Sequence, residues 1–436
     1  MSRTASPSPP ATFNLRAFGA VGDGVTNDGP ALQRALNALA SAAGGTLVVP
    51  AGRYAIASPV SKNFSGLKNP VTIRGVASST AVNTKGDGAQ LSHGLDLTSA
   101  FVIKTGQATV ALALTNVASL LIADMVFIGT PDASSDAGRT LFLNGIPDVT
   151  IRHSEFYGLS SRTEGGAIIH ANSCGLTIDQ TAFLGTTANS AVRTSVILAT
   201  NWKRISLTES VFVDYGQRPD YYGKLGLGPP FAWIMIADAA PLDSPSSRRD
   251  AMIRNVFMDE GGYHAIASVP DLYDEQAVPA DVIYVSDYKL NVSSLGTSAI
   301  YIDRGAQSTL IERASFELTR NADAAIDVTN VGEVILDRLA CTAAAKRIRA
   351  SATVGTLTVI NSTCTDVQSQ ARSTAVLSTA PDDDPVQYVR HEYLAVLRIE
   401  PDPEAHFAWT NRLLRCGADQ VCLTQRKNEL ARFLRR

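Results

Sequence analysis

The chain has 436 residues, of which 45% are hydrophobic, and a formal net charge of -3. That length is enough to bury a large core, or one long continuous core. The near-neutral charge argues against a nucleic-acid partner and against a polybasic membrane patch. The longest apolar runs, such as Ala108–Leu114 and Val117–Ala123, are too short to cross a bilayer.

Residues 1–12 are rich in Ser, Pro and small residues and predict a flexible N-terminus. They contain no apolar stretch like a signal-peptide core, so we expect no export signal in the chain as given. This start is compatible with a mature exported protein and with a cytoplasmic one.

The first predicted element is a helix from Gly29 to about Ala42. Asp28 is expected to cap it, and Pro30 suits its first turn. The apolar face of the helix is predicted to cover the open first coil of a repeating fold and to protect its edge. That face consists of Leu32, Leu36 and Leu39.

After this helix, a unit of about eight residues recurs, in which an apolar strand ends at an aromatic residue or a cysteine. The end residues are Phe127, Phe156, Phe183, Phe212, Phe257, Tyr288, Phe316, Cys341 and Cys364. They lie roughly 23 to 31 residues apart, with one longer interval after Phe212, as expected for the coils of a solenoid. We expect these side chains to stack between coils about 4.8 Å apart and to form an internal ladder.

A polar residue follows the strand in many copies and suits a bend between strands. These residues are Asp124, Arg152, Asp179, Asn255 and Asp337. The Leu/Asn pattern and helical segment of a leucine-rich repeat are absent, and a β-sandwich would not repeat one motif in phase. The pattern therefore predicts an all-β fold, a right-handed parallel β-helix over residues 13–378.

Each coil also contains a second apolar strand ahead of the repeated one. These strands are Thr140–Asn144, Ala167–Ala171, Ser195–Ala199, Ala232–Ala237, His264–Ser268, Ser298–Asp303 and Ala324–Thr329. Stacked in register, they would form one parallel sheet whose outward side chains make a continuous exposed strip.

The N-terminal segment carries a family resemblance. Residues 13–28 read Phe-Asn-Leu-Arg-Ala-Phe-Gly-Ala-Val-Gly-Asp-Gly-Val-Thr-Asn-Asp, and residues 44–54 read Gly-Gly-Thr-Leu-Val-Val-Pro-Ala-Gly-Arg-Tyr. With the helix between them, they closely resemble the opening motif of the pectate-lyase-like superfamily. The resemblance implies the β-helix fold. It says less about the reaction, since the superfamily includes lyases, hydrolases, epimerases and non-catalytic phage or surface proteins.

The C-terminal part differs in composition. Residues 379–386, with Pro-Asp-Asp-Asp-Pro at 381–385, predict a linker, and residues 387–436 predict a small helical domain. This part resembles a bacterial phycobilisome-linker-like domain of unknown function, and Cys416 and Cys422 match a two-cysteine variant of it. Compared with that domain, its last helix is shortened at Leu430–Arg436. The resemblance implies attachment or assembly, with a surface or assembly partner for residues 387–436.

The region from Asp214 to Arg304 interrupts the coil period with two insertions that would build walls around the exposed strip. It is rich in aromatic rings of the kind that stack on sugars. The candidate substrate-binding residues there are Tyr215, Tyr221, Tyr222, Trp233, Tyr263 and Tyr301, with Lys224. The alternative is that the rings only pack the loops. His170 lies on the same strip two coils earlier and would extend a binding groove.

The candidate catalytic residues in this region are Asp238, Glu260, His264, Asp303 and Arg304. Hydrolysis would need two carboxyl groups, with Asp238 and Asp303 or Glu260 and Asp303 as the pair. A β-elimination would need His264 or a Tyr as base, and Arg304 or Lys224 as the stabilising cation. Each residue has a structural alternative: an Asp303–Arg304 surface ion pair, a turn cap at Glu260, or a buried, hydrogen-bonded His264.

No cofactor is indicated. Gly22-Asp23-Gly24 predicts a tight turn, since the ligand spacing of a calcium loop is missing, and no zinc-ligand spacing occurs. Cys341 and Cys364 occupy matching positions on adjacent coils, and we expect two stacked buried thiols rather than a bridge. Cys416 and Cys422 are the more favourable disulfide pair in an exported protein.

The sequence thus leaves two functional hypotheses. In the first, the protein binds and cleaves a polysaccharide by β-elimination or glycosidic hydrolysis. The aromatic-walled insertions favour this hypothesis, and we adopt it as the main one. The motifs of polygalacturonases are absent from the strip, which favours the alternative, a non-catalytic glycan-binding or structural surface protein. Both predict a polysaccharide partner, no membrane insertion, and an extracellular or cell-surface location.

Overall fold

The computed structural model describes residues 10–67, 69–76, 98–106, 109–129, 138–161, 166–185, 195–213, 232–237, 249–259, 264–268, 280–292, 298–303, 306–318, 324–342, 346–380 and 383–435. The chain divides into two compact units. Unit 1 contains residues 1–202 and 207–235, and unit 2 contains residues 203–206 and 236–436.

Unit 1 consists of short parallel strands, one short 3-10 helix and one α-helix. Its elements are β1 (Thr12–Asn14), η1 (Leu15–Phe18), β2 (Asp23–Asn27), α1 (Gly29–Ser41), β3 (Gly45–Val48), β4 (Gly52–Ile56), β5 (Val60–Asn63), β6 (Val71–Arg74), β7 (Ser99–Ile103), β8 (Val110–Thr115), β9 (Leu120–Ala123), β10 (Val126–Gly129), β11 (Arg139–Asn144), β12 (Val149–Arg152), β13 (Glu155–Tyr157), β14 (Ala167–Asn172), β15 (Gly175–Asp179), β16 (Ala182–Leu184), β17 (Ser195–Thr200) and most of β18 (Arg204–Val213) and β19 (Ala232–Ile236).

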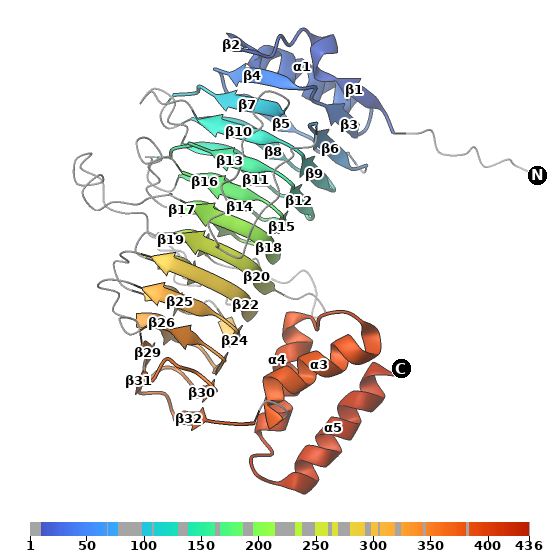
Figure 1. Ribbon diagram of the computed structural model, residues 1–436. Helices are drawn as coiled ribbons and strands as arrows, with labels where there is room; N and C mark the ends of the chain where they lie inside the picture. The colour runs from blue at the N-terminus through green and yellow to red at the C-terminus, as the bar shows by residue number, and fades with distance from the viewer. Residues whose placement is uncertain are drawn as a thin grey trace, which may run out of the picture. The chain divides into compact units, whose positions relative to one another are not determined.

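Each coil of unit 1 contributes to two parallel sheets (Figure 1). Strands such as β9, β12 and β15, and β10, β13 and β16, belong to sheet A, whereas β5, β8, β11, β14 and β17 form sheet B. Every strand pairs in parallel with its equivalent on the next coil, as β11 does with β8 and β14. The fold is therefore the predicted right-handed parallel β-helix.

The bends between strands use polar residues in the left-handed conformation. Asn116, Ser173 and Asn201 have positive φ after sheet B strands, and Asp124 and His153 have it after the first sheet A strand. Asn and Asp tolerate this conformation better than most residues, because their short polar side chains can form local hydrogen bonds. The predicted bend at Asp124 is confirmed. After β12 it falls one residue later than predicted, at the exposed His153.

The predicted ladder runs through the core of unit 1. Ring centroids are 5.8 Å apart for Phe101 and Phe127, 4.8 Å for Phe127 and Phe156, 5.0 Å for Phe156 and Phe183, and 4.5 Å for Phe183 and Phe212. The last three pairs are stacked, because parallel pairing places the same position of successive coils one strand spacing apart.

Helix α1 covers the first coil, and Leu32, Leu36 and Leu39 on its inner face are fully buried. In Figure 1 it lies across the end of the solenoid at β1 to β5. Asp28 occupies the predicted cap position of α1, but its side chain makes no capping hydrogen bond to the helix. The buried Asp28 carboxylate instead accepts hydrogen bonds from the backbone N–H groups of Val21 (2.7 Å) and Gly22 (3.2 Å), so it fixes the preceding turn. Gly22 has φ of 74°, and a Cβ there would lie 2.9 Å from the Tyr54 ring.

Unit 2 continues with longer strands and ends in three helices. Its elements are β20 (Asp250–Asp259), β21 (His264–Ser268), β22 (Ala280–Val292), β23 (Ser298–Asp303), β24 (Ala306–Glu312), β25 (Ser315–Leu318), β26 (Ala324–Thr329), β27 (Glu333–Asp337), β28 (Ala340–Cys341), β29 (Arg347–Ala350), β30 (Thr356–Ile360), β31 (Asp366–Ser369), β32 (Ser373–Leu377), α3 (Pro385–Leu397), α4 (Pro403–Leu414) and α5 (Gln420–Leu434). Within this unit β21, β23, β26, β29 and β31 belong to sheet B, and the other strands belong to sheet A.

The ladder predicted for unit 2 needs a correction of register. Met258 pairs with Leu290, Leu290 with Phe316, and Phe316 with Cys341. Phe257 and Tyr288 therefore do not occupy the ladder position. Phe257 instead pairs with Lys289, whose ammonium lies 6.0 Å from its ring centroid. The aromatic residue nearest the strand end was the wrong marker here, because an aliphatic side chain fills the same interior site.

The cysteines also differ from the expectation. Cys341 and Cys364 form a disulfide between adjacent coils, so the prediction of two buried thiols is wrong. Cys341 is only half-buried, and parallel stacking leaves the two Cα atoms 5.1 Å apart, within the range of a disulfide. The predicted Cys416–Cys422 disulfide is present.

The three C-terminal helices form a small core of their own with Val389, Tyr393, Trp409, Leu413 and Leu430. Each begins after an Asp that accepts backbone N–H hydrogen bonds, namely Asp384, Asp402 and Asp419. Helix α3 begins at Pro385, inside the predicted linker, and its cap residue Asp384 is fully buried. No helix in the described ranges is both long and apolar enough to span a bilayer.

Candidate functional site

The outward face of sheet B in unit 2 carries a strip of polar side chains. Along β23, Ile300 and Ile302 point into the core, and the alternate residues Tyr301 and Asp303 are partly exposed. In register with Tyr301, the strip continues through Asp327 on β26 and Arg349 on β29. The alternation of the strand sequences thus places an aromatic ring, a carboxylate and a guanidinium in one column.

His264 lies at the start of β21 and stacks on Tyr301. The ring centroids are 4.9 Å apart, and the planes differ by 15°. Its Nδ1 lies 2.9 Å from the backbone oxygen of Ser298, and because a carbonyl only accepts, Nδ1 carries the proton and Nε2 a lone pair. Burial lowers the pKa of His264, so the ring is neutral at pH 7.

Tyr301 keeps its proton. Its hydroxyl donates to Asp303 Oδ2 at 3.4 Å. Burial, together with the negative charges of Asp303 and Asp327, raises the pKa of Tyr301 to about 12. At neutral pH, the site therefore pairs a neutral imidazole with a neutral phenol.

Both carboxylates of the strip are held by donors. Asp303 Oδ1 accepts from Asn330 Nδ2 at 2.7 Å, and Asp327 Oδ2 accepts from Arg349 Nη2 at 2.6 Å. These donors fix the orientation of each carboxyl group on the strip. At the far end of the strip, Arg347 and Asp366 form a second ion pair at 2.9 Å.

In unit 1, His170 occupies the equivalent face of β14. Its Nε2 lies 3.0 Å from the hydroxyl of Thr200, which itself donates to Asn172 Oδ1 at 2.9 Å. The single Thr200 proton is thus in use, so His170 Nε2 is the donor to Thr200. Burial, helped by the charge of Arg139, lowers the pKa of His170 to about 4, and the ring is uncharged at pH 7.

The neighbours of His170 are mainly uncharged. Phe142 on β11 lies edge-on to its ring at 5.3 Å, and the guanidinium of Arg139 lies 5.3 Å from the Phe142 ring centroid. Beside them, Asn172 Nδ2 donates to Asn144 Oδ1 at 2.7 Å. This strip offers a flat ring and a column of amides, in contrast to the carboxylates and guanidinium groups of the strip in unit 2.

Trp233 does not belong to an exposed strip. Its ring is fully buried and stacks on Phe212 at 6.0 Å, next to the ladder of unit 1. A buried ring offers no face to a sugar, so Trp233 is removed from the set of substrate-binding residues. Its place on a sheet B strand was right, but its orientation was not predicted.

Several predicted site residues lie outside the described residues. They are Asp238, Glu260, Arg304, Tyr215, Tyr221, Tyr222, Lys224 and Tyr263. Each carboxyl pair suggested for hydrolysis includes one of them. Of the predicted residues in unit 2, the structure brings together His264, Tyr301 and Asp303.

The sequence analysis missed Asp327, Asn330 and Arg349. Asp327 occupies the same position in Ala324–Thr329 as Tyr301 does in Ser298–Asp303, so aligning the two strands would have found it. Arg349 lies on β29, a strand that the repeat did not reveal. Among the described residues, no group of three or more His, Cys, Asp or Glu side chains is arranged to hold a metal ion.

Comparison with known proteins places this geometry in context. Residues 12–189 match the family model described as "Rhamnogalacturonase A/epimerase, pectate lyase-like". A stretch of 69 residues, 15% of this chain, is 45% identical to the mannuronan C5-epimerase AlgE1 of Azotobacter vinelandii, and it covers 5% of that protein. These matches support the pectate-lyase-like superfamily for the N-terminal part of the β-helix.

Solved structures with a similar fold include two proteins of different kinds. The A-module of the mannuronan C-5 epimerase AlgE6 of Azotobacter vinelandii has a TM-score of 0.35 and 14% identity, over 85% of this chain and 100% of that chain. PfbA, a surface adhesin of Streptococcus pneumoniae, has a TM-score of 0.40 and 10% identity, over 85% of this chain and 90% of that chain. The resemblance of the C-terminal helices to a phycobilisome-linker-like domain stays a prediction.

Proposed function

We propose that the protein is a carbohydrate-active enzyme that binds an acidic polysaccharide on sheet B of unit 2 and abstracts the proton beside a sugar carboxylate. The observation that carries this proposal is the stack of neutral His264 on protonated Tyr301, in the same column as Arg349. A base, a neutral acid and a cation are the three groups that such a proton abstraction needs.

Each residue then has one role. His264 Nε2 takes the proton from C5 of the uronic acid, and the guanidinium of Arg349 stabilises the charge that develops on the carboxylate. In a β-elimination, the C4–O bond then breaks, and the phenol of Tyr301 gives its proton to the leaving oxygen. In an epimerisation, the same phenol returns a proton to C5 from the opposite face. Asp303 orients the Tyr301 hydroxyl.

Glycosidic hydrolysis fits the described residues less well. It requires one carboxyl group that stays protonated to act as the general acid. Asp303 accepts hydrogen bonds from two side chains, and Asp327 is paired with Arg349. Both carboxyl groups are thus engaged by hydrogen-bond donors within the protein, so neither is placed to protonate a glycosidic oxygen.

The proposal is tested by incubating the full chain with alginate, polygalacturonate and a neutral polysaccharide. An unsaturated-sugar absorbance identifies elimination, and a changed C5 configuration in the NMR spectrum identifies epimerisation. We expect His264→Ala to lower the rate about 10²- to 10⁴-fold. Tyr301→Phe removes only the hydroxyl and should lower the rate as well, whereas Glu317→Gln, at an exposed position on sheet A and away from the strip, should stay near the wild-type rate.

Reducing ends without unsaturated sugars would replace the proposal with hydrolysis. Binding without any product would replace it with a non-catalytic glycan-binding or surface role. An unchanged rate in both His264→Ala and Tyr301→Phe would move the reaction to another part of the chain.

For His170 we propose contact with sugar hydroxyls on the strip of unit 1. The half-buried Phe142 offers a ring face, and the column of amides at Asn144 and Asn172 offers hydrogen-bonding groups. Loss of oligosaccharide affinity in Phe142→Ala, with unchanged unfolding, would support this contact.

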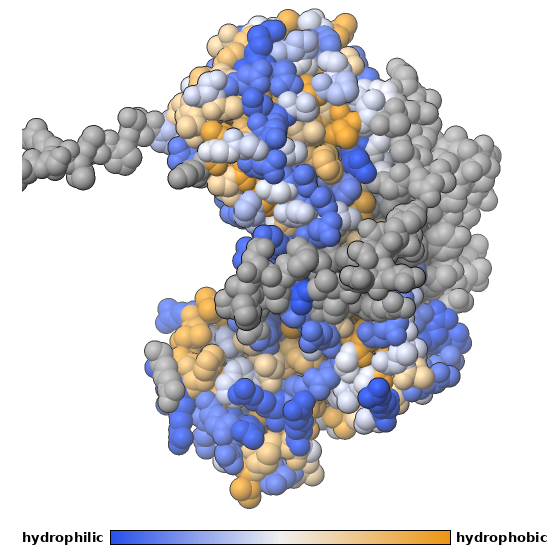
Figure 2. All heavy atoms as spheres, turned by 180° about the vertical axis from the view of Figure 1, so that it is seen from behind, coloured by the Kyte–Doolittle hydropathy of each residue, from blue (hydrophilic) through white to orange (hydrophobic). Residues whose placement is uncertain are grey.

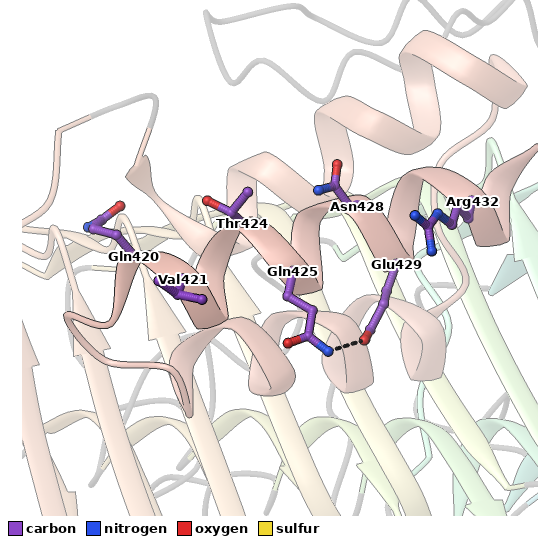
Figure 3. Close-up of a pocket in the computed structure, with 7 residues that line it drawn as sticks. All are labelled: Gln420, Val421, Thr424, Gln425, Asn428, Glu429 and Arg432. Atoms are coloured by element: carbon purple, nitrogen blue, oxygen red, sulfur yellow. Dashed lines mark hydrogen bonds between the residues drawn. The ribbon is translucent and has the colours of Figure 1, made fainter.

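For residues 387–436 we propose a surface or assembly partner that meets the outer face of α5. Helices α3 and α4 already pack against sheet A of unit 2, whereas Val421 on α5 is 79% exposed. Figure 3 shows this face, with Gln425 donating to Glu429. On the side of the molecule drawn in Figure 2, hydrophilic and apolar residues are interspersed over the described atoms.

An extracellular or cell-surface location is also proposed. Both disulfides, Cys341–Cys364 and Cys416–Cys422, suit an oxidising compartment. Non-reducing mass spectrometry of the protein from the medium or the cell surface checks the location and the bonds together. Recovery only from the cytoplasm with four free thiols at these positions would contradict it.

A further inference from the structure

The outer face of sheet A in unit 2 is covered by helices α3 and α4. An apolar cluster joins Tyr284, Leu310 and Ile335 on the strands to Val386 on α3 and Phe407 on α4. Figure 1 shows the two helices beside these strands. Next to the apolar cluster, the same interface encloses three carboxyl groups without exposed surface.

These carboxyl groups belong to Glu312, Asp337 and Asp384, each 0% exposed. Glu312 accepts hydrogen bonds from the Tyr284 hydroxyl (2.5 Å), from Gln387 Nε2 (2.9 Å) and from Arg313. Three donors, one of them a guanidinium, thus surround this buried carboxyl group.

Asp384 also accepts several hydrogen bonds. Its Oδ1 accepts from the backbone N–H groups of Val386 and Gln387, at 3.0 and 3.3 Å. Its Oδ2 accepts from Arg338 Nε and Asn361 Nδ2, both at 3.1 Å. Asp384 therefore joins the start of α3 to Arg338, which follows strand β27.

Asp337 accepts fewer hydrogen bonds than Glu312 or Asp384. Its Oδ2 accepts one hydrogen bond, from Gln387 Nε2 at 2.8 Å, and its Oδ1 has no partner among the described residues. The nearest guanidinium nitrogen, Arg338 Nε, is 3.9 Å from Oδ2. Burial and the adjacent Asp384 carboxylate raise the pKa of Asp337 to about 8, so at neutral pH its carboxyl keeps a proton to share with Asp384.

Other titratable and charged groups face this site from each packed element. They are Tyr284 and Asp287 on β22, Glu312 at the end of β24, Arg313 after β24, Arg338 after β27, Asp384 before α3, Arg390 on α3 with its partner Glu400, and His406 on α4. His406 donates from Nε2 to the oxygen of Val386 at 3.0 Å, and burial lowers its pKa, so it adds no positive charge at neutral pH.

We propose that the proton held between Asp337 and Asp384 is a latch that fastens α3 and α4 to sheet A, and that the two helices detach as this proton is lost. Without it, two adjacent carboxylates would be buried with one guanidinium in direct contact, and separation of the helices from the strands would let water solvate both. In this step the O–H bond of the shared proton breaks, its electron pair stays on the carboxylate, and the proton passes to a base in the solvent.

The sign of the pH dependence follows from linkage. In the detached state, Asp337 is exposed and returns toward its ordinary value of 3.8. The docked state holds a proton that the detached state releases, so the constant for detachment rises up to about tenfold per pH unit and levels off above about pH 8. His406 acts in the opposite direction, but only below its ordinary value of 6.5. The window from pH 6.5 to 8 therefore isolates Asp337.

Native-state hydrogen exchange of the full chain tests the latch. Protection factors for the amides of α3 and α4 should fall about 15-fold between pH 6.5 and 8. Asp337→Asn keeps the shape and cannot ionise, so its protection factors should not change across this window. Asp366→Asn, the same substitution at an exposed aspartate, should retain the wild-type slope.

Amides of Ile326 and Val328 in sheet B report whether unit 2 opens as a whole, and we expect them not to follow α3. A wild-type slope in Asp337→Asn would overturn the latch, and so would the absence of any slope in the wild type. Should Asp337→Asn not fold, Asp384→Ser keeps a capping side chain and removes the neighbouring charge. The slope should then shrink, and an unchanged slope would also overturn the proposal.

Discussion

The two faces of unit 2 use the same residue types in opposite environments. On sheet B, Arg347 and Asp366 are 40% and 43% exposed. On the outer face of sheet A, Glu312 and Arg313 are 0% and 19% exposed under the C-terminal helices. The first pair is screened by water and lies within reach of a ligand. The second pair is shielded from water and from ligands.

The exposed and the buried ion pairs of unit 2 therefore have different effects. A solvated pair contributes little to stability, because each charge is nearly as well off in water. A buried pair fixes the position of two elements, since removing one partner leaves a charge without compensation. The strip of sheet B is thus free to serve binding, and the interface of sheet A determines docking.

The largest effect is expected for Glu312→Ala. It leaves Arg313 with Asp287 and Gln387 with Asp337, but it removes the acceptor of the buried Tyr284 hydroxyl and one of the two acceptors of Gln387. We expect the free energy of unfolding of unit 2 to fall by about 3 to 5 kcal/mol, measured by urea titration. Glu317→Ala, at an exposed pair with Lys289, is the matched control. Equal losses in both variants would erase the contrast between the two faces.

An intermediate effect is expected for His406→Gln. Burial lowers the pKa of His406, so below pH 6.5 this histidine binds a proton in the unfolded chain but stays neutral in the folded chain. Wild-type stability should therefore fall between pH 6.5 and 5 by up to about 1.4 kcal/mol per pH unit from this group. The variant should lose less over the same range, as judged by unfolding at each pH. Parallel curves would show that His406 is charged in the fold.

The smallest effect is expected for Arg347→Ala on sheet B. Its pair with Asp366 should contribute about 0.2 to 1 kcal/mol, and less in high salt. Urea titration at low and high ionic strength measures this contribution. A loss of several kcal/mol would mean that the strip is structural, and it would weaken the proposal that its residues serve a ligand.

Much of the fold could be predicted from the sequence, because one coil repeats the same inside and outside pattern. The ladder from Phe127 to Phe212 follows directly from that pattern. In unit 2 the pattern misled at Phe257 and Tyr288, where register places Met258 and Leu290 in the interior column. A one-residue shift from Met258 to Phe257 turns the side chain to the other face, whereas the buried Tyr288 lies two residues before Leu290. Only pairing with the next coil fixes this register.

The candidate site was predicted in part for the same reason. His264, Tyr301 and Asp303 belong to strands that the sequence identified, and the structure brings them together. Arg349 was missed, since contact across coils depends on register rather than on spacing along the chain. Trp233 was misplaced, because orientation at a buried strand is set by the packing of both sheets.

By itself, the sequence determined the parallel β-helix, its capping helix and the strands that carry the exposed strip. Those features depend on local alternation, turn residues and a repeat, which are properties of short segments. The tertiary structure alone decided the surroundings of each carboxyl group. Asp327 and Asp337 are both strand residues, and the sequence pattern does not distinguish them. In the fold, Asp327 lies beside the guanidinium of Arg349 on a partly exposed strip, whereas Asp337 is fully buried beside Asp384. Charge state depends on neighbours in space, and the chain acquires those neighbours only by folding.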